Sequence, residues 1–263
     1  MVSFNLLSIA ALAAATASAQ NVSLRYMPLG DSITEAACWR AKLWHKFQDT
    51  EWSSVNFVGS SRGDNSCKDN QYDKDSEGHS GFQAIDIASK KQTDGWLKKN
   101  PADVVTVHLG TNDLAYNHPV GDIIKAFTSI LTSIRAANPK MKIIVRIPSD
   151  SSDTLKPTPR AAFVHCTTEY IMLTPVQVAQ IIPMMKDHAK QDASAITLNQ
   201  QLVTWARGLN RTESPIWIVD QHTGMTSSDM RDGLHPNDAG DVKMANVFYP
   251  ALLTAFKAAK ADK

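Results

Sequence analysis

Residues 103–113 read DVVTVHLGTND, a nearly unbroken apolar run that stops at a glycine. A strand with apolar side chains on both faces is typical of a parallel sheet covered by helices on both sides. Similar apolar runs occur at 23–29, 55–59, 141–147 and 215–219, and they alternate with helical patterns at 39–48, 82–98, 121–137, 193–206 and 237–259. This β–α alternation predicts a single α/β domain with a parallel sheet flanked by helices.

Short polar motifs follow three of these strands. GDSI at 30–33 follows the first strand, GTND at 110–113 follows the third, and DGLHP at 232–236 follows the last. Ligands of open parallel sheets bind beyond the carboxyl ends of the strands, so we expect these motifs to meet at one edge. A fourth motif, GHSG at 78–81, ends a long polar loop.

Ser32 and His235 supply the parts of an activated nucleophile. A serine hydroxyl attacks an ester only when a base accepts its proton, and His235 is the expected base. Asp232 can fold back onto the imidazole, fix its tautomer and stabilise its charge. Two alternatives stay open: Ser32, followed by Glu35, also resembles a helix cap, and Asp229 is a second potential partner for the imidazole.

An ester-cleaving site also needs hydrogen-bond donors for the oxyanion of the tetrahedral intermediate. The candidates are the backbone N–H groups of Ser32 and Gly81 and the side-chain amide of Asn112. Gly81 has an alternative interpretation as a turn glycine. Asn112 and Asp113 could instead form a helix N-cap pair.

These motifs resemble the four sequence blocks of the SGNH (GDSL-type) hydrolases. The blocks contribute Ser, Gly, Asn and His, which match Ser32, Gly81, Asn112 and His235, with isoleucine following Asp31-Ser32 where leucine is usual. Longer strings resemble secreted carbohydrate esterase family 3 enzymes, which remove acetyl groups from xylan: MPLGDSITE at 27–35, CWR at 38–40, EGHSGF at 77–82, and VDQ at 219–221 leading to DGLHPN. The similarity covers about residues 24–145 and 178–252.

The resemblance implies a doubly wound, flavodoxin-like domain with an open active site, a preference for small acyl groups, and no cofactor. We therefore expect a secreted esterase that acts on acetylated plant cell-wall polysaccharide such as acetylxylan. A lipase or lysophospholipase, with a broad apolar groove, is the alternative within the same chemistry. A non-catalytic carbohydrate-binding or cell-wall protein that retains the fold is the alternative from another class.

The first 19 residues are expected to be a signal peptide, leaving a domain at 20–263. Their apolar run at 6–15 is too short to cross a bilayer, and Ala17-Ser18-Ala19 fits a cleavage site. No Lys or Arg precedes the run, and a buried first helix is the alternative. In an oxidising compartment we expect Cys38 to pair with Cys67, leaving Cys166 over, and Asn21 and Asn210 to be glycosylation sites.

Charge and motifs restrict the partners. The net charge of +1, without a basic cluster, argues against nucleic acid or an anionic membrane as a partner. No segment after the first 19 residues has the pattern of a membrane span. No coiled-coil heptads occur, so we expect a monomer. The expected partner is the polysaccharide ester substrate that the family resemblance implies. No zinc or EF-hand motif occurs, although the acidic stretch 64–77 could hold calcium or form a solvated loop. His108 is expected in the core.

Residues 145–177 interrupt the pattern. They hold four of the twelve prolines and no sustained periodicity, and a structureless loop of this length is unusual inside a compact domain. Removing them joins 141–144 to 178–183 as one buried strand.

The coding possibilities of this segment fit an unspliced intron. Codons for 145–146 can read GTGCGT, those for 173–174 can contain CTAAC, and Gln177 can be CAG. The 33 residues correspond to 99 nucleotides, so the reading frame survives removal. The alternative is an inserted lid or substrate loop.

Overall fold

A parallel sheet carries the predicted motifs at its carboxyl edge. The computed structural model describes residues 23–64, 67–144 and 181–263. Within these residues six strands pair in parallel, in the order β2-β1-β4-β5-β6, with β3 also pairing with β1. They are β1 (Arg25–Gly30), β2 (Asn56–Phe57), β3 (Glu77–Gly78), β4 (Val104–His108), β5 (Lys142–Ile144) and β6 (Ile216–Trp217). The predicted fold class is confirmed.

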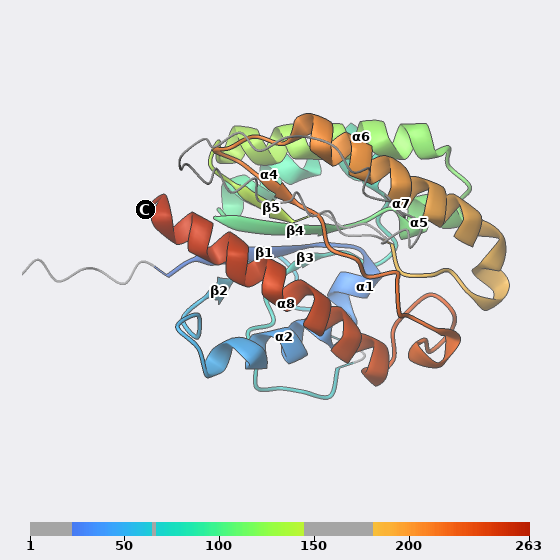
Figure 1. Ribbon diagram of the computed structural model, residues 1–263, viewed down its shortest axis with the longest axis horizontal. Coiled ribbons are helices and arrows are strands. Elements are labelled where there is room, and N and C mark those ends of the chain that lie inside the picture. Colours follow the sequence, from blue (N-terminus) through green and yellow to red (C-terminus); the bar gives the residue numbers. More distant parts are fainter. Residues whose placement is uncertain (1–22, 65–66, 145–180) are drawn as a thin grey trace, which may run out of the picture.

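Helices cover both faces of the sheet (Figure 1). One face carries α2 (Trp39–Gln48) and α8 (Asp238–Ala261), which pack against each other. The other carries α3 (Ala84–Ser89), α4 (Gln92–Lys99), α6 (Val120–Ala137) and α7 (Ala189–Leu209). Two short helices, α1 (Ser32–Glu35) and α5 (Thr111–Ala115), begin just beyond β1 and β4.

Successive strand residues enter different cores, which explains why the strands are apolar throughout. Tyr26 and Val104 pack in the core under α2 and α8. Their neighbours Met27 and Val105 pack in the core under α6 and α7. Because side chains alternate across a strand, a sheet buried on both faces needs apolar residues at every position.

The strand order reverses beside β1. The chain runs from β1 outward to β2 and then returns to pair β4 on the other side of β1. Such a reversal leaves a crevice at the carboxyl ends of the two central strands. Ser32 follows β1 and Asn112 follows β4, so both residues lie at this crevice.

The prediction of a single helix at 82–98 is wrong in one respect. The structure has two helices there, α3 and α4, separated at Lys90 and Lys91. Lys91 takes a left-handed conformation with φ of 50°. Both helices pack on α6, so the apolar periodicity continues across the break and does not reveal it.

The histidine in β4 lies in the core, as the sequence predicted. His108 is 2 % exposed. Trp39 is fully buried and its ring stacks on Phe248 of α8 with centroids 4.8 Å apart. The predicted signal peptide, Asn21, Cys166 and the segment 145–177 lie outside the described residues.

The chain on either side of segment 145–177 supports a continuous strand. The register of β4 and β5 pairs Ile144 with Thr106. Gly110 lies four residues after Thr106, in the segment that continues β4. The side chain of Ile181 lies beside Gly110, where an added Cβ would be 3.0 Å from Ile181 Cδ1. If Ile144 were joined to Val178, Ile181 would be the fourth residue after Ile144, which matches this advance. We propose that 145–177 is not part of the native chain.

A variant lacking 145–177 should fold and be more stable than the full chain. Shortening the connection 145–180 to three residues reduces the loop-closure cost by about 2 kcal/mol. For a domain of this size that corresponds to an increase in Tm of roughly 4–8 °C. Thermal unfolding of both chains measures the difference. A lower Tm for the shortened chain, or mature message that encodes Pro157 to Cys166, would contradict the proposal.

Candidate active site

A chain of two hydrogen bonds joins the three predicted triad residues. Ser32 Oγ lies 2.8 Å from His235 Nε2. His235 Nδ1 lies 2.8 Å from Asp232 Oδ2. With the proton on Nδ1, the imidazole donates to the carboxylate and leaves Nε2 as an acceptor for the serine proton. The arrangement is that of a nucleophile with its base and an orienting carboxylate.

The turn after β1 presents Ser32 at the start of α1. Gly30 ends β1. A Cβ added to Gly30 would lie 2.7 Å from the carbonyl oxygen of His108, so the backbones of β1 and β4 approach closely here. Asp31 caps α1, because its Oδ1 accepts from the N–H of Ile33 at 3.0 Å. The alternative interpretation of Ser32 as the helix cap is therefore wrong. Ser32 is the first residue of α1 and is half-buried.

Two buried carboxyl groups lie next to the reactive residues in the sequence. Burial raises the pKa of Asp31 to about 7, although the hydrogen bond from the N–H of Ile33 lowers it. Burial also raises the pKa of Asp113. Asp113 accepts from the N–H groups of Ala84 and Ile85 at 2.8 and 3.0 Å. It therefore caps α3 from another part of the chain and ties the GTND motif to the segment after Gly81.

A tight turn brings Asp232 back to His235. Gly233 has φ of 92°, and an added Cβ would lie 2.5 Å from the carbonyl oxygen of Met185. Asp232 Oδ1 accepts from the N–H groups of Leu234 and His235 at 2.9 and 2.8 Å. Burial alone would raise the pKa of Asp232, but these bonds and the imidazole lower it to about 2. Asp232 is therefore ionised at neutral pH.

Asp229, the alternative partner of His235, is engaged elsewhere. It accepts from the N–H and hydroxyl of Thr226 at 2.7 and 2.8 Å, and from Lys243 Nζ at 2.7 Å. The hydrogen bond from Lys243 lowers the pKa of Asp229. Asp229 holds the turn ahead of the DGLHP motif, and Asp232 is the partner of His235.

The three candidate oxyanion donors lie around the same cleft. Ser32, Gly81, Asn112 and His235 line a cavity of about 560 Å³ together with Ala36, Ser80, Arg231, Asp232 and Leu234. Asn112 Nδ2 donates to the carbonyl oxygen of Phe82 at 3.0 Å, which fixes the amide plane and leaves its second N–H available. Within the described residues, the N–H groups of Ser32 and Gly81 have no acceptor.

The conformation and position of Gly81 are compatible with both interpretations of its role. Its φ of 79° is in the left-handed region that favours glycine, as expected of a turn residue. The residue is also exposed at the cleft, as a donor to substrate must be. Neither Asn112 nor Asp113 is the N-cap of α5, whose N-cap residue is Gly110. Asp113 instead caps α3 through its side chain.

Buried polar residues that the sequence did not reveal hold the loop before Gly81. The Arg40 guanidinium donates to the carbonyl oxygens of Thr34, Glu35, Gly63 and Lys74. Glu35 Oε2 accepts from the N–H of Ser80 at 2.7 Å and from its hydroxyl. Glu35 therefore fixes the residue before Gly81 to the segment that follows Ser32. Arg40 belongs to the CWR string that resembles family 3 carbohydrate esterases, but that string did not show which groups Arg40 binds.

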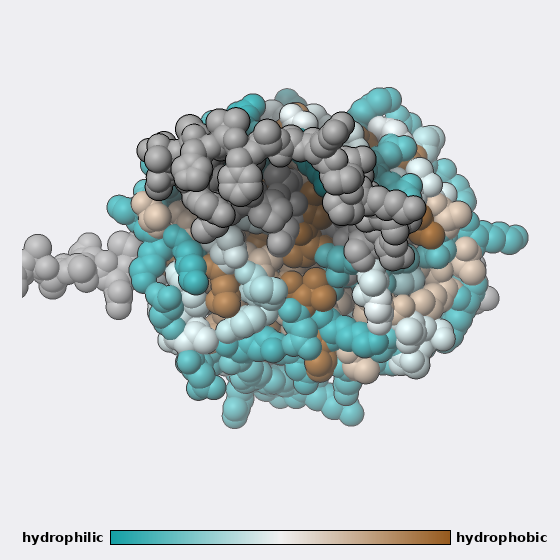
Figure 2. Space-filling view, in the orientation of Figure 1, coloured by the Kyte–Doolittle hydropathy of each residue, from teal (hydrophilic) through white to brown (hydrophobic). Residues whose placement is uncertain are grey.

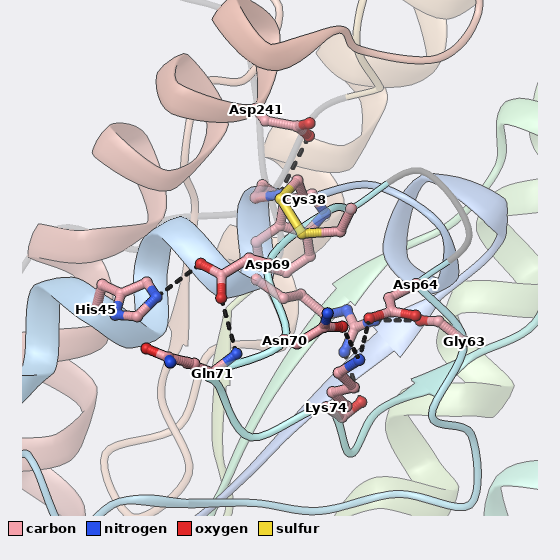
Figure 3. Close-up of a disulfide and its surroundings, with 12 residues drawn as sticks. Cys38, His45, Gly63, Asp64, Asp69, Asn70, Gln71, Lys74 and Asp241 are labelled. Carbon is pink, nitrogen blue, oxygen red and sulfur yellow. Dashed lines mark hydrogen bonds and ion pairs between the residues drawn. A yellow bond between two sulfur atoms is a disulfide. The ribbon is translucent and has the colours of Figure 1, made fainter.

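The predicted disulfide joins Cys38 at the start of α2 to Cys67 in the polar loop (Figure 3). Beside it, Asp241 of α8 accepts from the N–H of Trp39 at 3.1 Å. The disulfide and Asp241 together tie the loop, α2 and α8 to one another.

Carboxylates of the acidic stretch 64–77 are engaged separately. Asp64 lies 2.7 Å from Lys74 Nζ, and Asp69 lies 2.7 Å from His45 Nε2. Asp73 accepts from the N–H of Phe57 at 2.9 Å. In the part of the chain that the structure describes, no three His, Cys, Asp or Glu side chains converge as metal ligands.

Figure 2 shows mostly hydrophilic residues over α2 and the neighbouring lower edge of the molecule. Every helix within 23–64, 67–144 and 181–263 is too short or too polar to cross a bilayer.

The site combines a serine, an imidazole and a carboxylate in hydrogen-bond contact, at the carboxyl edge of a doubly wound sheet. This combination defines a hydrolase that works by acyl transfer. The sequence matches the GDSL-like Lipase/Acylhydrolase family over residues 29–242, and the chain belongs to this family. The resemblance to SGNH hydrolases is therefore confirmed, and the protein is a carboxylic ester hydrolase.

Solved structures similar to this chain include carbohydrate esterases. An acetyl esterase mutant crystallised with an acetate ion is 32% identical, with a TM-score of 0.71, over 89% of this chain and 98% of that one. A carbohydrate esterase family 3 protein from Talaromyces cellulolyticus is 33% identical, with the same TM-score and coverage. A Clostridium thermocellum family 3 carbohydrate esterase, 23% identical over 90% of this chain and 99% of that one, shares the fold with a TM-score of 0.60. No curated protein sequence matches.

Replacing Asp232 with Asn should lower kcat by about 10³–10⁴-fold with little change in Tm. The amide N–H would face Nδ1 and favour the tautomer with its proton on Nε2, which cannot accept from Ser32. Steady-state kinetics and thermal unfolding measure the two effects. Asp229→Asn is the matched control, since it should lower Tm through the contact with Lys243 and lower kcat far less than Asp232→Asn does. The reverse pattern would assign the catalytic carboxylate to Asp229.

Proposed function

We propose that the protein is a secreted serine esterase that removes acetyl groups from plant cell-wall polysaccharide such as acetylxylan. The observation that carries the proposal is the hydrogen-bonded chain Ser32–His235–Asp232 beside the donors Gly81 and Asn112 in an open cleft. Similarity to an acetyl esterase and to a family 3 carbohydrate esterase supports the substrate class.

The first half of the reaction transfers the acetyl group to Ser32. Its Oγ attacks the ester carbonyl while His235 Nε2 accepts the hydroxyl proton, and the Asp232 carboxylate stabilises the imidazolium. The carbonyl oxygen becomes an oxyanion that accepts from the backbone N–H groups of Ser32 and Gly81 and from the free amide N–H of Asn112. Each such donor contributes about 10²–10³ in rate.

The second half regenerates the enzyme. His235 gives its proton to the departing sugar oxygen as the tetrahedral intermediate collapses to an acetyl-enzyme. Water then enters, His235 takes a proton from it, and the new hydroxyl attacks the acetyl carbonyl. Acetate leaves with the C–O bond to Ser32 broken and the serine proton restored. These steps need no group beyond those of the chain and water.

The cleft favours a small acyl group over a long one. Among the nine described residues that line it, only Ala36 and Leu234 have apolar side chains. A long acyl chain needs an extended apolar surface to leave water, which this lining does not supply. The residues around the cleft instead offer hydroxyl, amide and charged groups of the kind that bind sugar hydroxyls. The lipase alternative is therefore less well supported.

A secreted location is part of the proposal. Cys38 and Cys67 form a disulfide. Disulfides persist in oxidising compartments and are rare in the cytosol. Asn210 of the second sequon is exposed and follows α7. We propose that residues 1–19 direct secretion, that Asn21 and Asn210 carry glycans, and that the protein acts as a monomer on a polysaccharide ester.

Hydrolysis of p-nitrophenyl esters from acetate to laurate should be fastest for acetate. Ser32→Ala should lower the rate by about 10⁴-fold or more while the protein stays folded. The substrate is tested by acetate release from acetylated xylan, compared with acetylated pectin and triglyceride. A maximum at long acyl chains would make the protein a lipase, and unchanged hydrolysis by Ser32→Ala would exclude Ser32 as the nucleophile.

A further inference from the structure

A buried glutamate and a half-buried histidine form a pair behind the oxyanion side of the cleft. Glu77 in β3 is fully buried and accepts from the N–H of Ser60 at 3.0 Å and from the Ser60 hydroxyl. It also lies 2.7 Å from His79 Nε2. Since β3 pairs with β1, the Glu77 carboxylate is held by the sheet itself. His79 lies outside the helices and strands, but Glu77 gives it a fixed partner.

The His79 ring stacks on two aromatic rings. Its centroid lies 4.8 Å from that of Phe82 at an interplanar angle of 25°. It lies 4.7 Å from that of Trp96 of α4 at 19°, and the centroids of Phe82 and Trp96 are 6.4 Å apart. The hydrogen bond to Glu77 and the two stacking contacts define the orientation of the ring. Phe82 is thereby held against a rigid support.

Phe82 connects this support to the proposed oxyanion donors. Its carbonyl oxygen accepts from Asn112 Nδ2 at 3.0 Å, and this bond sets the direction of the second amide N–H. Its backbone N–H donates to the carbonyl oxygen of His79 at 3.1 Å, closing a turn around Gly81. Gly81 thus lies between two anchored residues: Ser80, bound by Glu35, and Phe82, stacked on His79.

We propose that His79 is a positioning residue for the oxyanion hole, acting through Phe82 on Asn112 and Gly81. The proposal rests on the acyl-transfer function given above. Donors for an oxyanion act only when they point at the place where charge develops, and a displacement of about 1 Å can cost about 10²-fold in rate. A glycine-centred turn has little rigidity of its own, so the Glu77–His79 pair supplies it.

His79→Ala should lower kcat for p-nitrophenyl acetate by about 10–100-fold and change KM by less than about two-fold. His79→Phe keeps an aromatic ring that can stack on Phe82 and Trp96 and should recover part of the lost kcat. His45→Ala is the matched control, because the His45–Asp69 pair has the same 2.7 Å separation but lies on α2 away from the cleft. It should leave kcat unchanged.

A double-mutant cycle separates positioning from a general loss of structure. Asn112→Ala alone should lower kcat by about 10²–10³-fold. Adding His79→Ala to that variant should cost less than it does in the wild type, because one of the two donors that it positions is already absent. Inhibition by a small alkylboronic acid, which forms a tetrahedral adduct with serine, should weaken in parallel with kcat, whereas inhibition by acetate should not.

The outcomes distinguish the two proposals. Additive losses in the cycle, or wild-type kcat for His79→Ala, would overturn the positioning role and leave the esterase function intact. Wild-type kcat for Asn112→Ala would instead remove Asn112 from the oxyanion hole and with it the basis of the positioning role. If His79→Ala does not fold, Trp96→Leu removes one stacking face, keeps the bond to Glu77, and should lower kcat with unchanged KM. Unchanged kcat in Trp96→Leu would then contradict the proposal.

Discussion

The hydrogen bond between Ser32 Oγ and His235 Nε2 joins residues that are 203 positions apart in the chain. Neither residue has useful reactivity without the other. The serine hydroxyl needs a base to accept its proton, and the imidazole acts as a base only on a nucleophile that faces the substrate. The sheet makes this contact possible. Its strand order reverses beside β1, and the parallel connections place every strand's carboxyl end at one edge.

The reactive groups are supported by residues that are not among those lining the cleft. Asp31 caps the short helix that carries Ser32, and Asp113 caps α3 beside the GTND motif. Asp229 and Lys243 hold the turn that leads to His235. The site is thus rigid at the level of backbone turns, and such preorganisation is where electrostatic stabilisation of an oxyanion originates.

The sequence was informative where function depends on residue type at a fixed local spacing. Ser32, Asp232 and His235 lie in short motifs, and strand apolarity predicted the parallel sheet that unites them. Contacts made by loops were not predictable, since a loop has no periodicity that places its side chains. Arg40 binds four carbonyl groups from separate segments, and the partners of His79 come from β3 and α4. The break between α3 and α4 was hidden because both helices present apolar residues to α6.

Labelling with a fluorophosphonate that reacts with activated serine tests the central contact most directly. The account predicts that peptide mass spectrometry finds the label on Ser32 in the wild-type protein. Substituting His235 with Ala should slow labelling by orders of magnitude while the circular dichroism spectrum is preserved. Label on another serine, or equally fast labelling of Ser32 in the folded His235→Ala protein, would contradict the account.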